Sequence, residues 1–290
     1  MEIIEIKNVH KSYGNKEILH GMNMGVKEGS IHGLVGRNGS GKTTLIRCLT
    51  GIYKADKGEI LVNGKPVYEN PEAKVEMGYV ADLNQYFSGY YVDEMVEFYE
   101  GMYPSFDKDS FYNYNEVVGL DILKRIRELS KGQSMALASM LNLSIHPKVL
   151  VMDEPLSGLD PIAQKQIKEF VINEVDMYGM TVLISSHDLK DLEAFCDSVS
   201  MVKEGKVVCH GSMDEIKDGM MKIQAVFKDG LPGYVRDIPS IVTYSNIGSV
   251  YTIIFSEVST SMIDILCEMG ASMAEQIPMS LEEIFLFSNR

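Results

Sequence analysis

The sequence predicts an α/β protein built around a parallel β-sheet, followed by a small α+β domain. Two apolar runs, Val149–Met152 and Thr181–Ile184, are typical of strands buried on both faces, as in a parallel sheet. Apolar residues recur between them with helical spacing over Ile162–Val175, so the three segments form a βαβ unit. Toward the C-terminus the pattern changes to short strands and helices without chemical motifs. We therefore expect one large domain over 1–218 and a small domain over 219–290.

The remaining elements follow from apolar period and turn residues. Near the N-terminus we expect strands at Glu2–Ile6, Ser30–Val35 and Glu59–Val62, and a helix at Thr43–Leu49 that begins after a glycine-rich loop. Residues 71–129 read as helical and loop-rich. Further on we expect a hairpin around Glu204-Gly205, strands at Ile223–Phe227 and Val250–Phe255, and helices at Val258–Met269 and Ser280–Phe287.

Charge and cysteine content argue against several classes of protein. The chain carries 41 acidic and 27 basic residues, a net charge of −14, whereas a nucleic-acid binder needs a basic surface to neutralise phosphates. The four cysteines lie far apart and form no CxxC pair, so neither a zinc site nor a redox pair is indicated. No stretch approaches the about 18 consecutive apolar residues of a membrane helix, and the N-terminus has acids where a signal peptide has bases. We expect a cytoplasmic protein that binds no nucleic acid and reaches a membrane only through a partner.

A glycine-rich loop, GRNGSGKTT over Gly36–Thr44, fits the pattern G-x-x-x-x-G-K-[ST] and lies between an expected strand and an expected helix. Its glycines let the backbone curl and direct its N–H groups toward an anion, and the helix start adds partial positive charge. Lys42 supplies a point charge for β- and γ-phosphates, and the Thr43 hydroxyl is a hard ligand for Mg²⁺. Thr44 can donate to a further phosphate. The loop therefore predicts a site for the phosphates of a nucleotide.

Two carboxylates, Asp153 and Glu154, directly follow the apolar run in VLVMDEP. Ligands of parallel sheets bind beyond the carboxyl ends of the strands, which is where these side chains stand. Asp153 suits Mg²⁺, through a water molecule, whereas Glu154 points elsewhere and can take a proton from an attacking water. An Asp-Glu pair at a strand end usually has no catalytic role and only faces solvent where the chain leaves the sheet. The phosphate loop makes the catalytic interpretation the stronger one.

Five motifs follow one another in a characteristic order. After the phosphate loop come LSKGQ (Leu129–Gln133), VLVMDEP (Val149–Pro155), SGLD (Ser157–Asp160) and SSH (Ser185–His187). This order, over about residues 1–218, resembles the ATP-binding-cassette (ABC) ATPases. The resemblance implies the cassette form of the P-loop NTPase fold, with a parallel core sheet, an antiparallel β subdomain and a helical subdomain at about 82–145. It also implies ATP hydrolysis with Mg²⁺ by a homodimer.

In that family two cassettes pack head to tail, and the signature motif of one covers the γ-phosphate held by the phosphate loop of the other. LSKGQ resembles the usual signature Leu-Ser-Gly-Gly-Gln, with Lys131 in place of the first glycine, which is a frequent variation. The resemblance implies that Ser130, Gly132 and Gln133 contact the ATP of the partner copy. A serine hydroxyl, a glycine N–H and the start of a helix suit such a contact.

Further residues take roles by the same resemblance. Tyr13 matches the aromatic residue that stacks on adenine, His187 the histidine that contacts the γ-phosphate and the attacking water, and Asp160 the aspartate that links the two sites of the dimer. In the phosphate loop, the implied ATP-binding residues are Gly36, Asn38, Gly39, Ser40, Gly41, Lys42, Thr43 and Thr44. The implied catalytic residues are Glu154, His187 and Lys42, and the implied Mg²⁺ ligands are Thr43, Asp153 and Asp82.

One position departs from the family pattern. A glutamine usually follows a strand resembling GYVPQ and contacts Mg²⁺ and the attacking water, but here the stretch is GYVADLNQYF, with Asp82 in that slot. Asp82 is still an oxygen ligand for Mg²⁺, although it adds negative charge and cannot donate a hydrogen bond. Gln85, three residues on, is the alternative occupant.

Aromatic residues concentrate around this slot, because residues 79–114 contain 12 of the 25 Tyr and Phe side chains. One interpretation is the aromatic core of a helical subdomain. The other is an exposed docking surface, since Tyr and Phe are enriched at interfaces. In transporter cassettes this region receives the cytoplasmic helices of the membrane subunit. The candidates for such a contact are Tyr86, Phe87, Tyr90 and Tyr91.

Within the family, the segments GIYKADKGEI, MYPSFD and SLEEIFL resemble bacterial exporter-type cassettes of the antibiotic-resistance kind related to bacitracin transport. The leading hypothesis is therefore an ATPase subunit at the inner face of the cell membrane. It would power a separate transmembrane permease that exports a drug, peptide or lipid-like substrate. The alternative is a soluble cassette that acts in an assembly such as iron–sulfur cluster biogenesis.

Other cassette proteins fit less well. Chromosome and DNA-repair cassettes place a long coiled coil between phosphate loop and signature, whereas Lys42 and Ser130 are only 88 positions apart. Translation-factor types carry two cassettes in one chain, and this chain has one phosphate loop. An ATP sensor that does not hydrolyse would need a broken acidic pair, and Asp153-Glu154 is intact.

Overall fold

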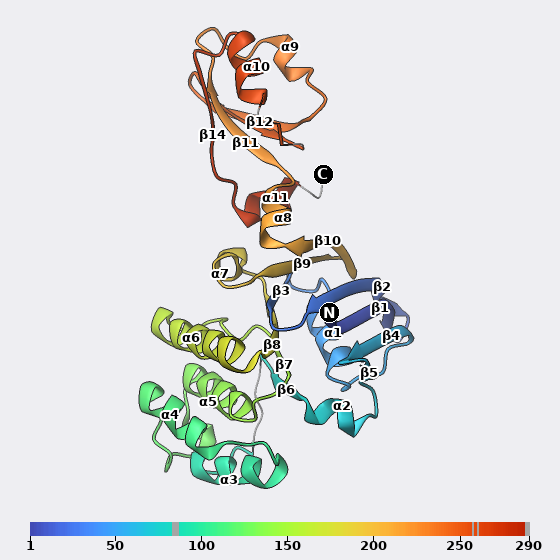
Figure 1. The fold of residues 1–290 in the computed structure, drawn as a ribbon, viewed down its shortest axis with the longest axis vertical. Helices are drawn as coiled ribbons and strands as arrows, with labels where there is room; N and C mark the ends of the chain where they lie inside the picture. Colours follow the sequence, from blue (N-terminus) through green and yellow to red (C-terminus); the bar gives the residue numbers. More distant parts are fainter. Residues whose placement is uncertain (83–86, 257, 260, 288–290) are drawn as a thin grey trace. The chain divides into compact units, whose positions relative to one another are not determined.

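The computed structural model describes residues 1–82, 87–256, 258–259 and 261–287. The chain divides into two compact units, Met1–His210 and Gly211–Arg290 (Figure 1). The sequence placed this division at 218, but the short helix α8 (Met213–Lys217) belongs to the second unit.

The first unit contains a six-stranded sheet in the order β10-β9-β3-β8-β7-β6. Its strands are β3 (Ile31–Val35), β6 (Met77–Val80), β7 (Val149–Met152), β8 (Thr181–Ser186), β9 (Ser198–Lys203) and β10 (Lys206–Ser212). The pairs β6·β7, β7·β8, β3·β8 and β3·β9 are all parallel, and β7 is buried at every position. Parallel strands end at one edge of the sheet, so the segments after β3, β6, β7 and β8 meet there.

A second, four-stranded sheet has the order β2-β1-β4-β5 and antiparallel pairing. It consists of β1 (Glu2–Tyr13), β2 (Lys16–Lys27), β4 (Lys57–Val62) and β5 (Lys65–Pro66). Its apolar side chains pack with helix α1 (Lys42–Leu49) in one core cluster, which includes Ile4, Leu19, Leu45 and Leu49. The sequence does not predict strand β2, because its two glycines and its polar residues interrupt the alternation of apolar and polar side chains.

Four helices gather beside β6, β7 and β8 (Figure 1). They are α3 (Val92–Met102), α4 (Lys108–Val118), α5 (Lys131–Leu143) and α6 (Pro161–Tyr178); the short helices α2 (Pro71–Val75), η1 (Ile126–Glu128) and α7 (Leu189–Glu193) complete the unit. The buried carboxylate of Glu174 on α6 accepts a hydrogen bond from the Tyr114 hydroxyl of α4, and it lies 2.8 Å from Nδ1 of His146. These contacts fasten α4 and the α5–β7 loop to α6.

The second unit is a four-stranded antiparallel sheet with strand order β12-β13-β11-β14. Its elements are β11 (Met221–Val226), α9 (Gly233–Arg236), β12 (Ile241–Ile247), β13 (Val250–Phe255), α10 (Met262–Glu268), β14 (Met273–Gln276) and α11 (Leu281–Phe287). The order βαββαβ is the split βαβ motif of ferredoxin-like folds. Helix α10 begins at Met262 rather than at the expected Val258, because Ser259 and Ser261 favour turns and caps over helix interiors.

Candidate functional site

The phosphate loop connects the buried end of β3 to the first turn of α1. Gly39 (φ 80°) and Gly41 (φ 112°) have left-handed backbone conformations, which glycine adopts without the cost that a Cβ would bring. Gly36 is required for a different reason. A Cβ there would lie 2.4 Å from the Val202 carbonyl oxygen and 2.6 Å from Ser40 Oγ. The loop therefore packs against β9, and only glycine fits at its start.

Replacing Gly36 with alanine is expected to lower both the free energy of unfolding and the affinity for ATP. The Val202 carbonyl is backbone and cannot rotate away, so overpacking should cost about 1–3 kcal/mol. Urea unfolding and nucleotide titration measure the two effects. Gly101→Ala is the matched control, because a Cβ at Gly101 meets no atom of the described residues within 4 Å. A Gly36→Ala protein as stable as the Gly101→Ala protein would contradict this packing.

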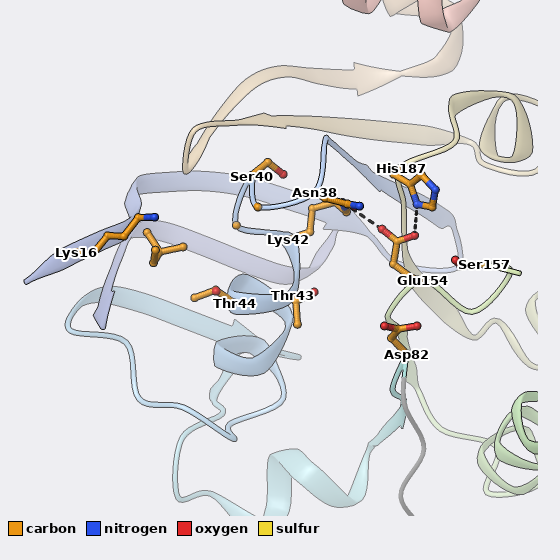
Figure 2. Close-up of a pocket in the computed structure, with 13 residues that line it drawn as sticks. Lys16, Asn38, Ser40, Lys42, Thr43, Thr44, Asp82, Glu154, Ser157 and His187 are labelled. Atoms are coloured by element: carbon orange, nitrogen blue, oxygen red, sulfur yellow. Dashed lines mark hydrogen bonds and ion pairs between the residues drawn. The ribbon is translucent and has the colours of Figure 1, made fainter. Parts of the chain in front are cut away.

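Lys42, Glu154 and His187 are joined by two contacts beside the loop (Figure 2). The Lys42 ammonium donates to the Gly36 carbonyl oxygen at 2.6 Å and lies 3.1 Å from Oε1 of Glu154. The other oxygen of Glu154 is 2.6 Å from Nδ1 of His187. Lys42 is only 5% exposed, so its charge requires a nearby anion, and Glu154 supplies it here.

Asp153, the residue before Glu154, is almost fully buried. Its Oδ1 accepts hydrogen bonds from Ser185 Oγ at 2.7 Å and from Thr43 Oγ1 at 3.3 Å. Ser185 Oγ also accepts from the Glu154 N–H at 2.9 Å, which fixes the turn after β7, where Glu154 has the uncommon φ of 50°. Burial raises the pKa of Asp153, and the negative charges of Glu154 and Asp82 also raise it. The two hydrogen bonds from Ser185 and Thr43 act the other way and lower this pKa. A cation at Asp153 would offset this cost.

Lys42, Glu154 and His187 line a pocket of about 510 Å³ at the ends of the strands, whereas Asp153 is not part of its lining (Figure 2). Its lining contains ten residues that the sequence predicted: Asn38, Gly39, Ser40, Gly41, Lys42, Thr43, Thr44, Asp82, Glu154 and His187. Lys16, Ile18 and Ser157 also line it, and the sequence reasoning did not identify them. The sequence does contain a pattern that places Lys16 near the predicted site: Gly14-Asn15 is a turn that brings Lys16, at the start of β2, beside Tyr13.

Ser40 tests whether the loop fits a phosphate. Its hydroxyl oxygen is buried, lines the pocket and has no hydrogen-bond partner among the described residues. A buried hydroxyl without a partner is costly, and a phosphate oxygen in the loop would satisfy it. Together with the Lys42 ammonium and the start of the eight-residue helix α1, this chemistry fits an anion with several oxygens.

The residues predicted to contact or link to the partner copy, Ser130, Gly132, Gln133 and Asp160, lie outside this pocket. Ser130 caps α5 in a reciprocal pair with Gln133: Ser130 Oγ accepts from the Gln133 N–H at 3.2 Å, and Gln133 Oε1 accepts from the Ser130 N–H at 3.1 Å. Asp160 caps α6 by accepting from two backbone N–H groups. Tyr13 is 43% exposed at the end of β1 and packs edge-on against Tyr53.

The slot that the family fills with glutamine is occupied at the pocket by Asp82, which follows β6. Gln85, the alternative candidate, lies outside the described residues, and so does Tyr86 of the aromatic segment. Within the part of the chain that the structure describes, no helix is both long and apolar enough to cross a membrane.

A phosphate loop between a strand and a helix, with an acidic pair after the neighbouring parallel strand, defines a P-loop NTPase. A family model described as ABC transporter matches residues 19–157. The ABC transporter ATP-binding protein YtrB of Bacillus subtilis (strain 168) is 28% identical over 284 residues, 98% of this chain and 97% of YtrB. The bacitracin transport ATP-binding protein BcrA of Bacillus licheniformis is 30% identical over 218 residues, 74% of this chain and 71% of BcrA.

The solved structure of cbiO1 from Clostridium perfringens, part of the ABC transporter complex cbiONQ, is similar to this chain with a TM-score of 0.63. It is 30% identical and covers 74% of this chain and 90% of its own. The chain belongs to the ABC transporter ATP-binding family. It is an ATPase of the nucleotide-binding cassette type, which confirms the family and the fold class expected from the motif order.

Proposed function

We propose that two copies of this chain hydrolyse ATP between them and power a separate permease, as the energy-supplying subunit of an exporter. The contacts of Lys42 with Glu154 and of Glu154 with His187 support this proposal, because they bring a cation that can bind phosphate and a base that can activate water into one pocket. The transport role named for BcrA supports export. In this proposal the chain sits at the inner face of the membrane, held there by the permease.

The triphosphate of ATP fits along the loop from Ser40 to Thr44. Backbone N–H groups at the start of α1 and the hydroxyls of Ser40 and Thr44 would donate to its oxygens. The Lys42 ammonium would exchange Glu154 for the β- and γ-phosphates, because both anions compete for the same buried cation. Binding of ATP would therefore free the Glu154 carboxylate at the moment when it is needed.

Mg²⁺ would be held by the Thr43 hydroxyl, by Asp82, and by Asp153 through a water molecule. The oxygen-only donor set and the raised pKa of buried Asp153 support a cation at this place. When bound, the ion would neutralise charge on the β- and γ-phosphates.

Glu154 would act as the general base. Once released from Lys42, its carboxylate would accept a proton from the water that attacks the γ-phosphorus. The bond between the γ-phosphorus and the oxygen that links it to the β-phosphate would then break, and ADP would leave. His187, 2.6 Å from Oε2, holds the carboxylate in place and can contact the γ-phosphate. Rate enhancement would come from positioning and from charge around the transferring group.

The signature motif would complete the site of a second copy. A Cβ at Gly132 would meet only Leu159 Cδ2 at 3.7 Å and Ser130 Oγ at 4.0 Å among the described residues, so none of these neighbours requires glycine there. A backbone open to a partner supports the trans contact, with Ser130 and Gln133 at the same helix start. Asp160 would link the two sites, and the exposed ring of Tyr13 would stack on adenine.

The permease would dock on exposed aromatic residues of the helical region. Phe87 and Tyr90 are 53% and 39% exposed, and their ring centroids are 4.9 Å apart. Tyr91 is instead anchored, because its ring lies under the Arg125 guanidinium and its hydroxyl accepts from Arg125 Nη2. Phe87 and Tyr90 are therefore the better candidates from the aromatic segment.

Co-purification from membranes tests this role. We expect the tagged chain to bring down a multi-spanning membrane protein, and Phe87→Ala with Tyr90→Ala to lower the recovered permease by about tenfold or more. ATP affinity should stay unchanged, because both residues lie outside the nucleotide pocket. Tyr234→Ala, at a 56% exposed tyrosine of the second unit, is the control. Recovery of soluble assembly factors without a membrane protein would overturn the proposal in favour of the iron–sulfur alternative.

A further inference from the structure

The second unit leaves strand β12 at the edge of its sheet. In the order β12-β13-β11-β14, β12 pairs with β13 on one side and has no neighbour among the described strands on the other. Unpaired N–H and C=O groups of an edge strand are a template for another strand, and proteins usually protect them with charges, proline or a bulge. The seven residues IVTYSNI contain neither a charge nor a proline, and the register shift of this strand lies between Ile241 and Thr243, so only its first half is irregular. At its second half, Tyr244–Ile247, every residue is exposed.

The hairpin formed by β12 and β13 is uncharged throughout. Residues 211–290 contain 11 acidic and 5 basic side chains, yet residues 241–256 contain none. A run of this length without charge is unexpected in a unit where one residue in five is charged. Exposed surface that avoids charge is typical of the centre of an interface.

An apolar row crosses the face of the sheet that the two crossover helices leave open. Ile223 and Ile253 point to the other face, into the core cluster that contains Val235 of α9 and Leu266 of α10. Neighbouring positions in the strands point the opposite way. At one end of the open face, the register places four apolar side chains in line: Ile247, Val250, Val226 and Met273.

Most of this row is in contact with water. Ile247 is 90% exposed, Met273 54% and Val250 36%. The opposite end of the open face is covered, because Lys222 of β11 donates to Glu283 of α11 at 2.6 Å. Helix α11 therefore closes one half of the face and leaves the apolar row uncovered, and this row ends at the regular second half of β12.

We propose that β12 pairs with β12 of a second copy, in antiparallel orientation, and joins the two four-stranded sheets into one. Antiparallel pairing of a strand with itself has the two-fold symmetry of a closed dimer. Copies that each carry a net charge of −14 repel, and residues 241–256 contain no charged side chain, so a contact through this hairpin adds no like-charge repulsion of its own. A partner recognised by opposite charge would find nothing to bind on this hairpin.

This pairing does not need nucleotide, which separates it from the ATP-dependent dimer of the cassettes. Sedimentation of the full chain in EDTA after apyrase treatment should show a dimer. Ile247→Lys should raise the dissociation constant by about tenfold or more, since the symmetric contact then holds two like charges. Met177→Lys, at a 73% exposed apolar position on α6, should leave it unchanged. The 90% exposure of Ile247 means that the substitution leaves the fold intact.

A cross-linking experiment tests the strand itself. In a background with Cys209→Ser and Cys267→Ser, which removes the two cysteines that are not buried, Ser245→Cys near the middle of β12 should give a covalent dimer with a short bis-maleimide, and Met177→Cys should not. A nucleotide-free chain that is monomeric at high concentration would overturn the proposal. A dimer that Ile247→Lys does not weaken, or that Ser245→Cys does not cross-link, would overturn it as well. Failure of ATP to close the cassettes would contradict the proposed function and leave this inference standing.

Discussion

Lys42→Ala should lower the affinity for ATP by about 2–5 kcal/mol, which is roughly 30-fold or more. The Lys42 side chain is 5% exposed and its ammonium contacts the Gly36 carbonyl oxygen and Glu154, so it would meet the phosphates at a buried position where charge–charge attraction is strong. Alanine removes this attraction and leaves the Glu154 carboxylate facing the γ-phosphate as an unpaired negative charge. Isothermal titration with ATP and Mg²⁺ measures the loss directly.

A double-mutant cycle separates these two effects. If part of the loss comes from the unpaired Glu154, adding Glu154→Gln to Lys42→Ala should restore some affinity, because an amide does not repel phosphate. Lys165→Ala is the matched control, since Lys165 is 76% exposed on α6 and should contribute little. Unchanged ATP affinity in Lys42→Ala would refute the assignment of the phosphate loop.

The sequence predicted the centre of the site because its parts are local. The strand, loop and helix around Gly36–Thr44 form a contiguous motif, and Asp153-Glu154 directly follow a strand whose apolar run matches β7 residue for residue. A parallel sheet then brings the two segments to one edge whatever the intervening chain does. Strand β13 was predicted to the residue for a similar reason, since its apolar run is short and bounded by turns.

What the sequence could not supply depends on contacts between distant segments. The Lys42–Glu154 ion pair joins positions 112 apart, and the need for glycine at position 36 comes from the carbonyl of Val202. No local pattern encodes either contact. The open apolar row of the second unit is likewise a product of register, because Ile247 and Met273, on the two outer strands, come into one row only after four strands have paired.

Glu154→Gln should retain ATP binding and lower the rate of phosphate release by roughly 10²–10⁴-fold, the contribution expected of a general base. The amide has nearly the same shape but cannot accept the proton of the attacking water. It also no longer competes with phosphate for the Lys42 ammonium, which Oε1 approaches to 3.1 Å here. ATP affinity in this variant should therefore equal or exceed that of the wild type.

Because ATP would bind without being hydrolysed, Glu154→Gln should also trap the closed cassette dimer. Sedimentation with Mg²⁺ and ATP should show this closure as a nucleotide-dependent shift, best measured in the Ile247→Lys background, where the nucleotide-free contact is weakened. Glu169→Gln, at a 55% exposed position on α6, controls for the loss of one negative charge. If Glu154→Gln released phosphate at the wild-type rate, Glu154 would not be the base, and its pairing with Lys42 and His187 would serve the architecture of the pocket alone.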